Sequence, residues 1–292
     1  MSGASLPLEL LCELAVQAAR EAGSCIRSAD VSLLRRSLKD VGSSEASKIV
    51  TEVDVRSEAI IHQALQDSLE RWDIAFLGEE SSLIGSTAPD RLSASCFWCV
   101  DPLDGTLPFS RGEPGYAVSI ALVECSGTPL IGVVYDPLNG RLLYAVKGQG
   151  CHREPRDQAR PENADSLLVF ADASLKQQQG YQTMIQNLDS CGQQLGLGGV
   201  TEIYGAGAVM NACQVLDYSA ACYLKPPKPE EGGGSIWDFA ATACIVEEAG
   251  GWASDYTGQK LELNRPASIF MNHRGVLYAS SEGLARELLK AL

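Results

Sequence analysis

The sequence predicts an α/β (α+β) fold, and three observations support this class. In the first half, a series of segments with alternating apolar residues is typical of antiparallel strands. In the second half, strand and helix patterns alternate, which indicates α/β layering. The 292 residues contain no internal repeat and no long linker. We therefore expect a single domain over 1–292, with an N-terminal α+β lobe over about 1–150 and a C-terminal α/β lobe over about 151–292.

Apolar spacing predicts the elements of the first half. A helix is expected over 6–28, and a second helix opens at 51–54 and keeps an apolar face as far as Leu69. The predicted strands are 74–77, 96–100, 116–124, 130–136 and 142–146. Gly- and Pro-containing turns separate the last three strands. The segments predicted as irregular are 82–95 and 153–165.

The second half changes rhythm. Its predicted strands are 167–171, 200–204, 220–224 and 276–279. Its predicted helices are 174–195, 205–216, 237–249 and 282–292, with Gly180 weakening the first of them. The segment 225–235 is rich in Pro, Lys, Glu and Gly, and is predicted to be a loop.

Composition narrows the possible partners and the compartment. Hydrophobic residues make up 45% of the chain, an ordinary share for a globular protein. No apolar run is long enough to span a bilayer, and the N-terminus lacks the basic and apolar regions of a secretory signal. We therefore expect a cytoplasmic protein with no membrane partner. The net charge of −14 argues against a nucleic-acid polymer as the main partner.

The ten cysteines are scattered through apolar stretches, without the framework of a small disulfide-linked domain. We expect them to be reduced and mostly buried. Cys96 and Cys99 form a C-x-x-C pattern, but a structural zinc site needs two more ligands at close spacing, and none is nearby. Core cysteines on a strand are therefore the favoured interpretation.

The candidate chemistry is concentrated in Asp101-Pro102-Leu103-Asp104-Gly105-Thr106. Two carboxylates held close together repel each other, and a bound cation such as Mg²⁺ is the usual remedy. Gly105 allows close approach of the backbone to a ligand. Thr106 is predicted to cap a helix that starts at Leu107, whose free N–H groups would face an anion such as phosphate. The alternative is a plain turn, since Asp-Pro and Asp-Gly are common turn dipeptides.

Five segments in order resemble one family. Residues 101–106 resemble the signature D-P-[ILV]-D-G-T of the inositol monophosphatase family of Mg²⁺-dependent, lithium-sensitive sugar and nucleotide phosphatases. The other segments are Thr51-Glu52-Val53-Asp54, Gly78-Glu79-Glu80-Ser81, Trp237-Asp238-Phe239-Ala240-Ala241 and Glu248-Ala249-Gly250-Gly251. The resemblance covers roughly residues 8–290. It implies a layered α-β-α-β-α sandwich of the sugar-phosphatase type, and a homodimer.

The resemblance also implies a set of metal ligands, for two or three Mg²⁺ per subunit. Glu79, Asp101 and the carbonyl of Leu103 would hold the first ion. Asp101, Asp104 and Asp238 would hold the second, and a weaker third ion would use Glu79 and waters. Without the resemblance, adjacent acids after a strand, such as Glu79 and Glu80, are usually solvated loop residues.

The remaining roles concern the attacking water and the phosphate. The resemblance implies that Asp54 and Thr106 orient and deprotonate the water, and that the N–H groups of Gly105 and Thr106 hold phosphate oxygens. The alternative role for Asp54 is a charge at the start of a helix, favoured by the helix dipole. The family also has a site lysine in a loop near residues 39–47. The spacing to Asp54 does not identify this lysine here, so Lys39 and Lys48 both stay unassigned.

The choice of substrate stays open. The resemblance implies phosphate release from a small sugar- or inositol-type phosphate. Aligning 215–223 places Lys225 near a glutamate that contacts substrate hydroxyls in inositol monophosphatases, and the loop after it is longer here. Lys225 and Lys228 would then meet the second phosphate of a 3′(2′),5′-bisphosphate nucleotide, or are solvated loop lysines. An inactive Mg²⁺-binding scaffold is a third alternative, but the complete set of motif residues favours an enzyme.

Overall fold

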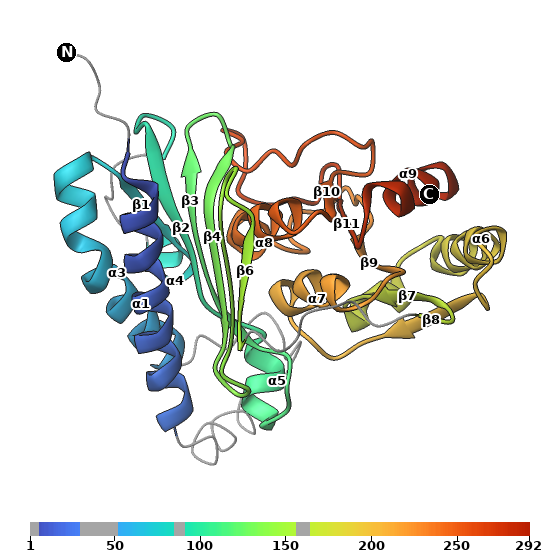
Figure 1. The fold of residues 1–292 in the computed structure, drawn as a ribbon, viewed down its shortest axis with the longest axis horizontal. Helices are drawn as coiled ribbons and strands as arrows, with labels where there is room; N and C mark the ends of the chain where they lie inside the picture. Colours follow the sequence, from blue (N-terminus) through green and yellow to red (C-terminus); the bar gives the residue numbers. More distant parts are fainter. Residues whose placement is uncertain (1–5, 30–51, 85–90, 156–163) are drawn as a thin grey trace.

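The computed structural model describes residues 6–29, 52–84, 91–155 and 164–292. Two sheets and three groups of helices alternate across the molecule (Figure 1). The outer helices on one side are α1 (Leu8–Ser28) and α3 (Glu52–Trp72), and those on the other side are α6 (Tyr181–Gln194) and α9 (Glu282–Ala291). The expected α-β-α-β-α layering is therefore confirmed.

The larger sheet packs against α1 and α3. It has six strands in chain order, of which β1 and β2 are parallel and all other neighbours are antiparallel. The strands are β1 (Ala75–Gly78), β2 (Cys96–Asp104), β3 (Ala117–Glu124), β4 (Pro129–Asp136), β5 (Arg141–Val146) and β6 (Cys151–Glu154). Four buried alanines of α1 face this sheet, so the helix can approach β4 closely: Ala15, Ala18, Ala19 and Ala22.

The smaller sheet belongs to the second half of the chain. Its five strands lie in the order β10-β11-β9-β7-β8, with β7 parallel to β8 and β9. The strands are β7 (Leu167–Phe170), β8 (Val200–Ile203), β9 (Ala221–Lys225), β10 (Trp252–Ser254) and β11 (Val276–Ala279). The neighbours β10–β11 and β11–β9 are antiparallel, so this sheet is mixed.

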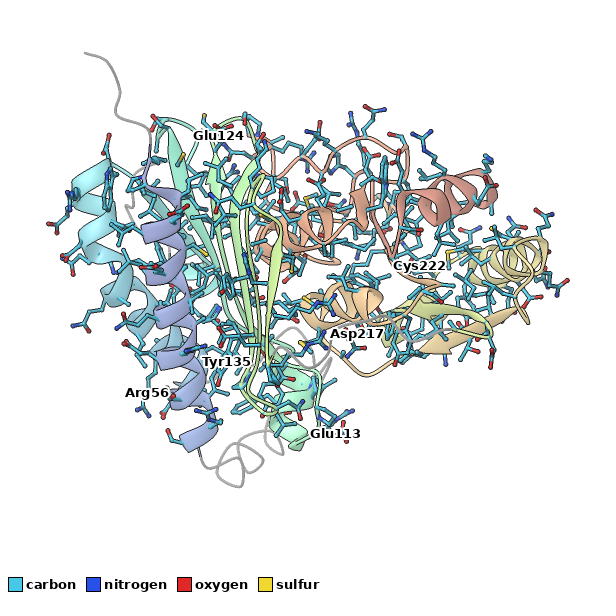
Figure 2. The ribbon with its side chains drawn as sticks, viewed as in Figure 1. Arg56, Glu113, Glu124, Tyr135, Asp217 and Cys222 are labelled. Atoms are coloured by element: carbon cyan, nitrogen blue, oxygen red, sulfur yellow. The ribbon has the colours of Figure 1, made fainter. Side chains whose placement is uncertain are left out.

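Helices α7 (Ala208–Gln214) and α8 (Ile236–Glu248) fill the space between the two sheets. Because α8 contacts β3 and β4 on one side and β10 on the other, it is apolar almost all round. Three cores separate the layers, and Figure 2 labels Tyr135 in the core under α1 and Cys222 in the core under α6 and α9. The first turn of α8 is thereby fixed beside the larger sheet.

Several elements differ from the prediction. The short helix α4 (Glu79–Ile84) begins in acidic residues expected in a loop. The last two residues of β6, a polar strand at the sheet edge, lie in the segment 153–165 that was expected to be irregular. The predicted helix over 174–195 is divided into η1 (Ala173–Gln177) and α6, because Gly180 adopts φ +83°. The remaining short helices are α5 (Thr106–Arg111) and η2 (Val215–Asp217).

Two expectations about composition can be compared with the structure. All ten cysteines are free, and seven of them are buried, including Cys96 and Cys99 of β2. None of the helices in the described residues combines the length and the apolar character needed to cross a membrane.

Candidate metal centre

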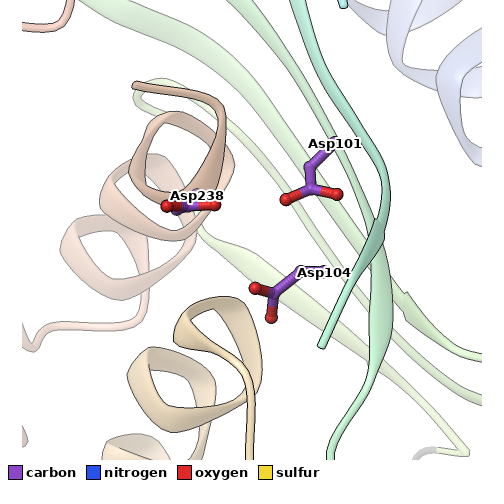
Figure 3. A group of neighbouring side chains, drawn as sticks. All are labelled: Asp101, Asp104 and Asp238. Carbon is purple, nitrogen blue, oxygen red and sulfur yellow. The ribbon is translucent and has the colours of Figure 1, made fainter. Parts of the chain in front are cut away.

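A bulge in β2 turns both aspartates of the central motif toward the same face of the larger sheet. Residues i and i+3 of a regular strand point to opposite faces. Here the pairing with β3 shifts from Asp101↔Ser119 to Asp104↔Ala117, so β2 carries one extra residue in this interval. Pro102 lies there and has no N–H to donate to a neighbouring strand. The bulge therefore directs both carboxylates toward α8 (Figure 3).

Helix α8 supplies a third carboxylate from 134 residues further along the chain. Asp238 lies in the first turn of α8, and its Oδ2 accepts a hydrogen bond from the N–H of Ser235 at 2.8 Å. Ser119 of β3, the partner of Asp101, donates its hydroxyl to the carbonyl of Trp237 at 3.2 Å. This contact ties the first turn of α8 to the sheet beside the bulge.

Figure 3 shows the three carboxylates gathered between β2 and α8. One oxygen of each of Asp101, Asp104 and Asp238 lies within 4.8 Å of the others. Among the described residues, no other group of three His, Cys, Asp or Glu side chains has this spacing. Oxygen ligands from several carboxylates are the donors that Mg²⁺ and Ca²⁺ prefer.

Asp104 is also held by the start of α7. Its carboxylate accepts hydrogen bonds from the N–H groups of Ala208 at 3.1 Å and Val209 at 2.9 Å. These amides belong to the first turn of the helix, where N–H groups lack partners within the helix. The backbone of α7 therefore sets the orientation of Asp104 before any ligand arrives.

Burial and mutual repulsion disfavour the charged form of the acids in this centre. Burial and then the charges of Glu79 and Asp104 raise the pKa of Asp101 well above its usual range. Burial and the neighbouring Asp238 raise the pKa of Asp104 to about 8, and burial raises the pKa of Asp238 too. A divalent cation would relieve both the repulsion and the desolvation. The donor set therefore fits the expected Mg²⁺.

Glu79 lies close to the three aspartates but outside that compact group, and Asp54 lies close to Glu79. Glu79 follows β1, and because β1 and β2 are parallel neighbours, Glu79 lies near the residues that follow Val100. Burial, followed by the charges of Asp238, Glu80, Asp54 and Asp104, raises the pKa of Glu79 to about 9. Asp54, in the first turn of α3, is only 3% exposed. The structure thus gathers acids from four separate elements.

The predicted capping role of Thr106 is wrong. The helix α5 starts at Thr106 itself, and its N-cap is Gly105, which adopts φ +83°. A Cβ at Gly105 would lie 2.7 Å from the carbonyl oxygen of Gly115, so the position requires glycine. The hydroxyl of Thr106 instead donates to the carbonyl of Leu103 at 3.3 Å. The Asp54–Thr106 pair stays a prediction.

Lys225, at the end of β9, reaches the edge of this centre with a partner that the sequence analysis missed. Its Nζ lies 2.8 Å from Oδ2 of Asp172, and its charge lowers the pKa of both Asp104 and Asp238. Tyr223 donates its hydroxyl to Oδ1 of Asp172 at 3.3 Å. Asp172 follows soon after the end of β7, just as Asp101 follows the apolar part of β2. This position of an acid after a strand is the sequence feature that could have identified Asp172 as a candidate.

The remaining residues weighed in the sequence analysis, and the histidines, contribute nothing described to this centre. Lys39, Lys48 and Thr51 lie outside the described residues. The three histidines contact other side chains: His62 packs on Phe76, His152 stacks on Tyr144, and His273 bonds to Glu262.

The model of the inositol monophosphatase family matches residues 8–292. The chain belongs to this family. The expected resemblance is confirmed over nearly the whole length of the chain. The fold and the acidic centre described above are therefore those of a member of the inositol monophosphatase family.

Relatives of two kinds are similar in sequence. The Nus factor SuhB of Pseudomonas aeruginosa is 33% identical over 258 residues, which cover 86% of this chain and 87% of SuhB. Inositol monophosphatase 1 of Sus scrofa is 28% identical over 291 residues, covering 98% of this chain and 95% of the pig protein. Similarity in sequence therefore spans proteins with two different names and does not separate them.

Solved structures agree with the fold. The crystal structure of the extragenic suppressor protein SuhB from Bartonella henselae superimposes with a TM-score of 0.69 at 25% identity, covering 97% of this chain and 98% of that one. An inositol monophosphatase structure from Anabaena gives a TM-score of 0.67 at 22% identity, covering 97% and 96%. The layered sandwich of the sugar-phosphatase type is thus confirmed.

Proposed function

We propose that this protein is a Mg²⁺-dependent phosphomonoester hydrolase that releases phosphate from a small sugar- or inositol-type phosphate. The observation that carries the proposal is the convergence of Asp101, Asp104 and Asp238, whose carboxylate oxygens lie within 4.8 Å of one another and whose pKa values are all raised. When all four are ionised, these three carboxylates and that of Glu79 carry a charge of −4, which two Mg²⁺ would balance. Family membership supports the same reaction class.

The metal site would use Glu79, Asp101 and the Leu103 carbonyl for one ion, and Asp101, Asp104 and Asp238 for the other. Bound Mg²⁺ supplies two things to a phosphate ester: it lowers the pKa of bound water and it neutralises charge on the leaving oxygen. The protein contributes fixed ligands. Asp104 is held by two amides of α7, and Asp238 by the amide of Ser235.

The water and the phosphate would be handled by residues around the bulge. Asp54 is buried in the first turn of α3, which suits a carboxylate that accepts a proton from the attacking water. Thr106 would orient that water through its hydroxyl. The N–H groups of Gly105 and Thr106 would donate to phosphate oxygens, because the left-handed turn at Gly105 leaves them outside the strand ladder.

A second candidate substrate class has one specific observation in its favour. Lys225 and Lys228 line the same cavity of about 40 Å³, together with Asp172. Two ammonium groups on one cavity, of which Lys225 also acts on Asp104 and Asp238, suit a substrate with a second phosphate, such as a 3′(2′),5′-bisphosphate nucleotide. The Lys225–Asp172 ion pair would have to open, or to share Lys225 with that phosphate.

The partners and the assembly belong to the same proposal. We expect a homodimer in the cytoplasm, acting on a small phosphorylated substrate. The similarity to proteins named Nus factor SuhB makes a role beside catalysis a second possibility for the partners. An inactive Mg²⁺-binding scaffold is the third alternative, and the full set of predicted ligands argues against it.

One experiment tests the proposal. Purified protein is screened for phosphate release with Mg²⁺ across inositol, sugar and nucleotide phosphates, with Asp104→Asn as the matched control. We expect turnover that disappears after chelation, returns with Mg²⁺, decreases with lithium and is nearly absent in the variant. Turnover equal in wild type and variant, or full activity in excess chelator, would remove the metal mechanism.

A further inference from the structure

Glu58 is a buried glutamate of α3 to which the family motifs give no role. It lies four residues after Asp54, so both carboxylates project from the same face of the helix. Glu58 is 6% exposed and Asp54 is 3% exposed. A buried carboxylate needs a partner that offsets its loss of solvation. The partners of Glu58 show what the side chain does.

Both oxygens of Glu58 accept backbone hydrogen bonds from α4. Oε2 accepts the N–H of Glu80 at 2.8 Å, and Oε1 accepts the N–H of Ser81 at 2.8 Å. These amides lie in the first turn of a six-residue helix, where no intrahelical partner exists. A carboxylate that receives two N–H bonds holds the turn in a single orientation, with stronger bonds than a neutral acceptor would form.

The strand before α4 is shaped around the same carboxylate. A Cβ at Gly78, the last residue of β1, would lie 2.3 Å from Oε2 of Glu58. Glycine is therefore needed for the carboxylate to reach the turn. Glu79 lies between Gly78 and Glu80, so Glu58 fixes the backbone on both sides of the predicted metal ligand.

We propose that Glu58 is a positioning residue for the metal centre, which holds the backbone of Glu79 in place and links it to Asp54 through one turn of α3. The proposal rests on the proposed function, because it assigns Glu79 to the metal. Partners outside the ligand set that orient metal ligands typically change metal affinity or activity by about 10–100-fold when they are removed. Glu58→Gln keeps the shape but turns one acceptor into a donor that faces an N–H group.

The chain offers a matched control in Glu248, near the end of α8. Its carboxylate also accepts two backbone N–H bonds, from Gly148 and Gly150, each at 2.7 Å. Those glycines belong to the turn between β5 and β6, which contains none of the predicted metal ligands. Glu248→Gln therefore removes the same kind of contact without touching the centre.

The experiment measures Mg²⁺ binding by isothermal titration, the Mg²⁺ dependence of phosphate release and the melting temperature in wild type, Glu58→Gln and Glu248→Gln. We expect Glu58→Gln to raise the Mg²⁺ dissociation constant about 10–100-fold, with partial recovery of kcat at high Mg²⁺ and a smaller effect on the substrate KM. Glu248→Gln should lower only the melting temperature. An unchanged Mg²⁺ affinity in Glu58→Gln would overturn the proposal and leave the metal mechanism intact.

Two further measurements separate the outcomes. If Glu58 acts through Glu79, its substitution adds no further loss of Mg²⁺ affinity in a Glu79→Gln background, and an additive loss contradicts that route. In metal-free wild type, the amides of Glu80 and Ser81 should be protected from hydrogen exchange, because Glu58 holds them without Mg²⁺. Fast exchange there would overturn the proposal even if Glu58→Gln fails to fold. Wild type that binds no Mg²⁺ would overturn the proposed function itself.

Discussion

Asp217 and the aspartates of the candidate metal centre have surroundings of opposite charge. Asp217, labelled in Figure 2, accepts hydrogen bonds from Arg141 at 2.6 and 2.8 Å and from Arg153 at 3.1 Å, and so links η2 to β5 and β6. Asp101 instead lies among other carboxylates, whose charges add to the effect of burial on its pKa. At Asp217 the chain supplies more cations than acids. At the candidate metal centre, the described residues supply more acids than cations, which favours a ligand of positive charge.

The largest effect is expected from the centre itself. Asp104→Asn keeps the shape of the side chain but removes a ligand charge. We expect kcat at saturating Mg²⁺ to fall by roughly 100-fold or more, at or beyond the upper end of the 10–100-fold range for partners outside the ligand set. Phosphate release under saturating substrate is the measurement. Near-normal kcat would place Asp104 with Asp217, as a structural acid.

Lys225 is a cation beside the acidic centre, and its charge offsets part of the repulsion among the acids. If it reads a second phosphate, Lys225→Met should reduce kcat/KM for a 3′,5′-bisphosphate nucleotide roughly 10- to 100-fold, as expected for losing a charge-assisted bond of about 1.5–3 kcal/mol. The same substitution should reduce kcat/KM for a monophosphate much less. The comparison is made at one ionic strength and at saturating Mg²⁺. Equal losses on both substrates would leave Lys225 as the partner of Asp172 alone.

The pKa values predict how metal-free stability depends on pH. Glu79 and Asp104 have folded pKa values of about 9 and about 8, above the unfolded values of carboxyl groups. Their contribution to stability is therefore complete at acidic pH and is lost as pH rises toward 8–9. Metal-free Asp104→Asn should melt above wild type at pH 8.5, by about 2–4 °C per kcal/mol of relieved repulsion. A difference that does not grow between pH 5.5 and 8.5 would contradict this.

The smallest effect on activity is expected at Asp217. Asp217→Asn leaves Arg141 and Arg153 without a charged partner, so we expect a loss of about 1–3 kcal/mol of unfolding free energy. Because Asp217 and its two arginines lie outside the candidate metal centre, kcat at saturating Mg²⁺ should stay within about twofold of wild type. Urea unfolding and phosphate release measure the two quantities. A large loss of kcat in folded Asp217→Asn protein would contradict the assignment of Asp217 to a structural role alone.

The sequence predicted the layers and the gathering of acids better than the geometry that brings them together. Asp101 and Asp104 are three residues apart, and only the bulge at Pro102 brings them to one face. The sequence contains the proline, but a bulge is defined by its pairing with β3, which is a tertiary contact. Asp238 could be assigned only from the family motif, because 134 residues separate it from Asp104.

The residues that the prediction missed depend on contacts made across the fold. Asp172 follows a strand without any motif around it, and its partner Lys225 lies on a neighbouring strand. The role of Glu58 depends on its contact with the first turn of α4, and the sequence did not predict that a helix starts at Glu79. The capping role of Thr106 failed because a local preference for a threonine cap was overridden by the left-handed turn at Gly105.

Proton release on metal binding tests the central claim most directly. At pH 7 the metal-free centre holds protons, because the pKa values of Glu79 and Asp104 are about 9 and about 8. Mg²⁺ binds carboxylates in their charged form, so its addition to weakly buffered, metal-free protein should release protons in proportion to the occupied sites. Asp217→Asn should release as many as wild type, and Asp104→Asn fewer. Mg²⁺ that binds without releasing protons, or does not bind, would contradict the assignment of these acids to a metal centre.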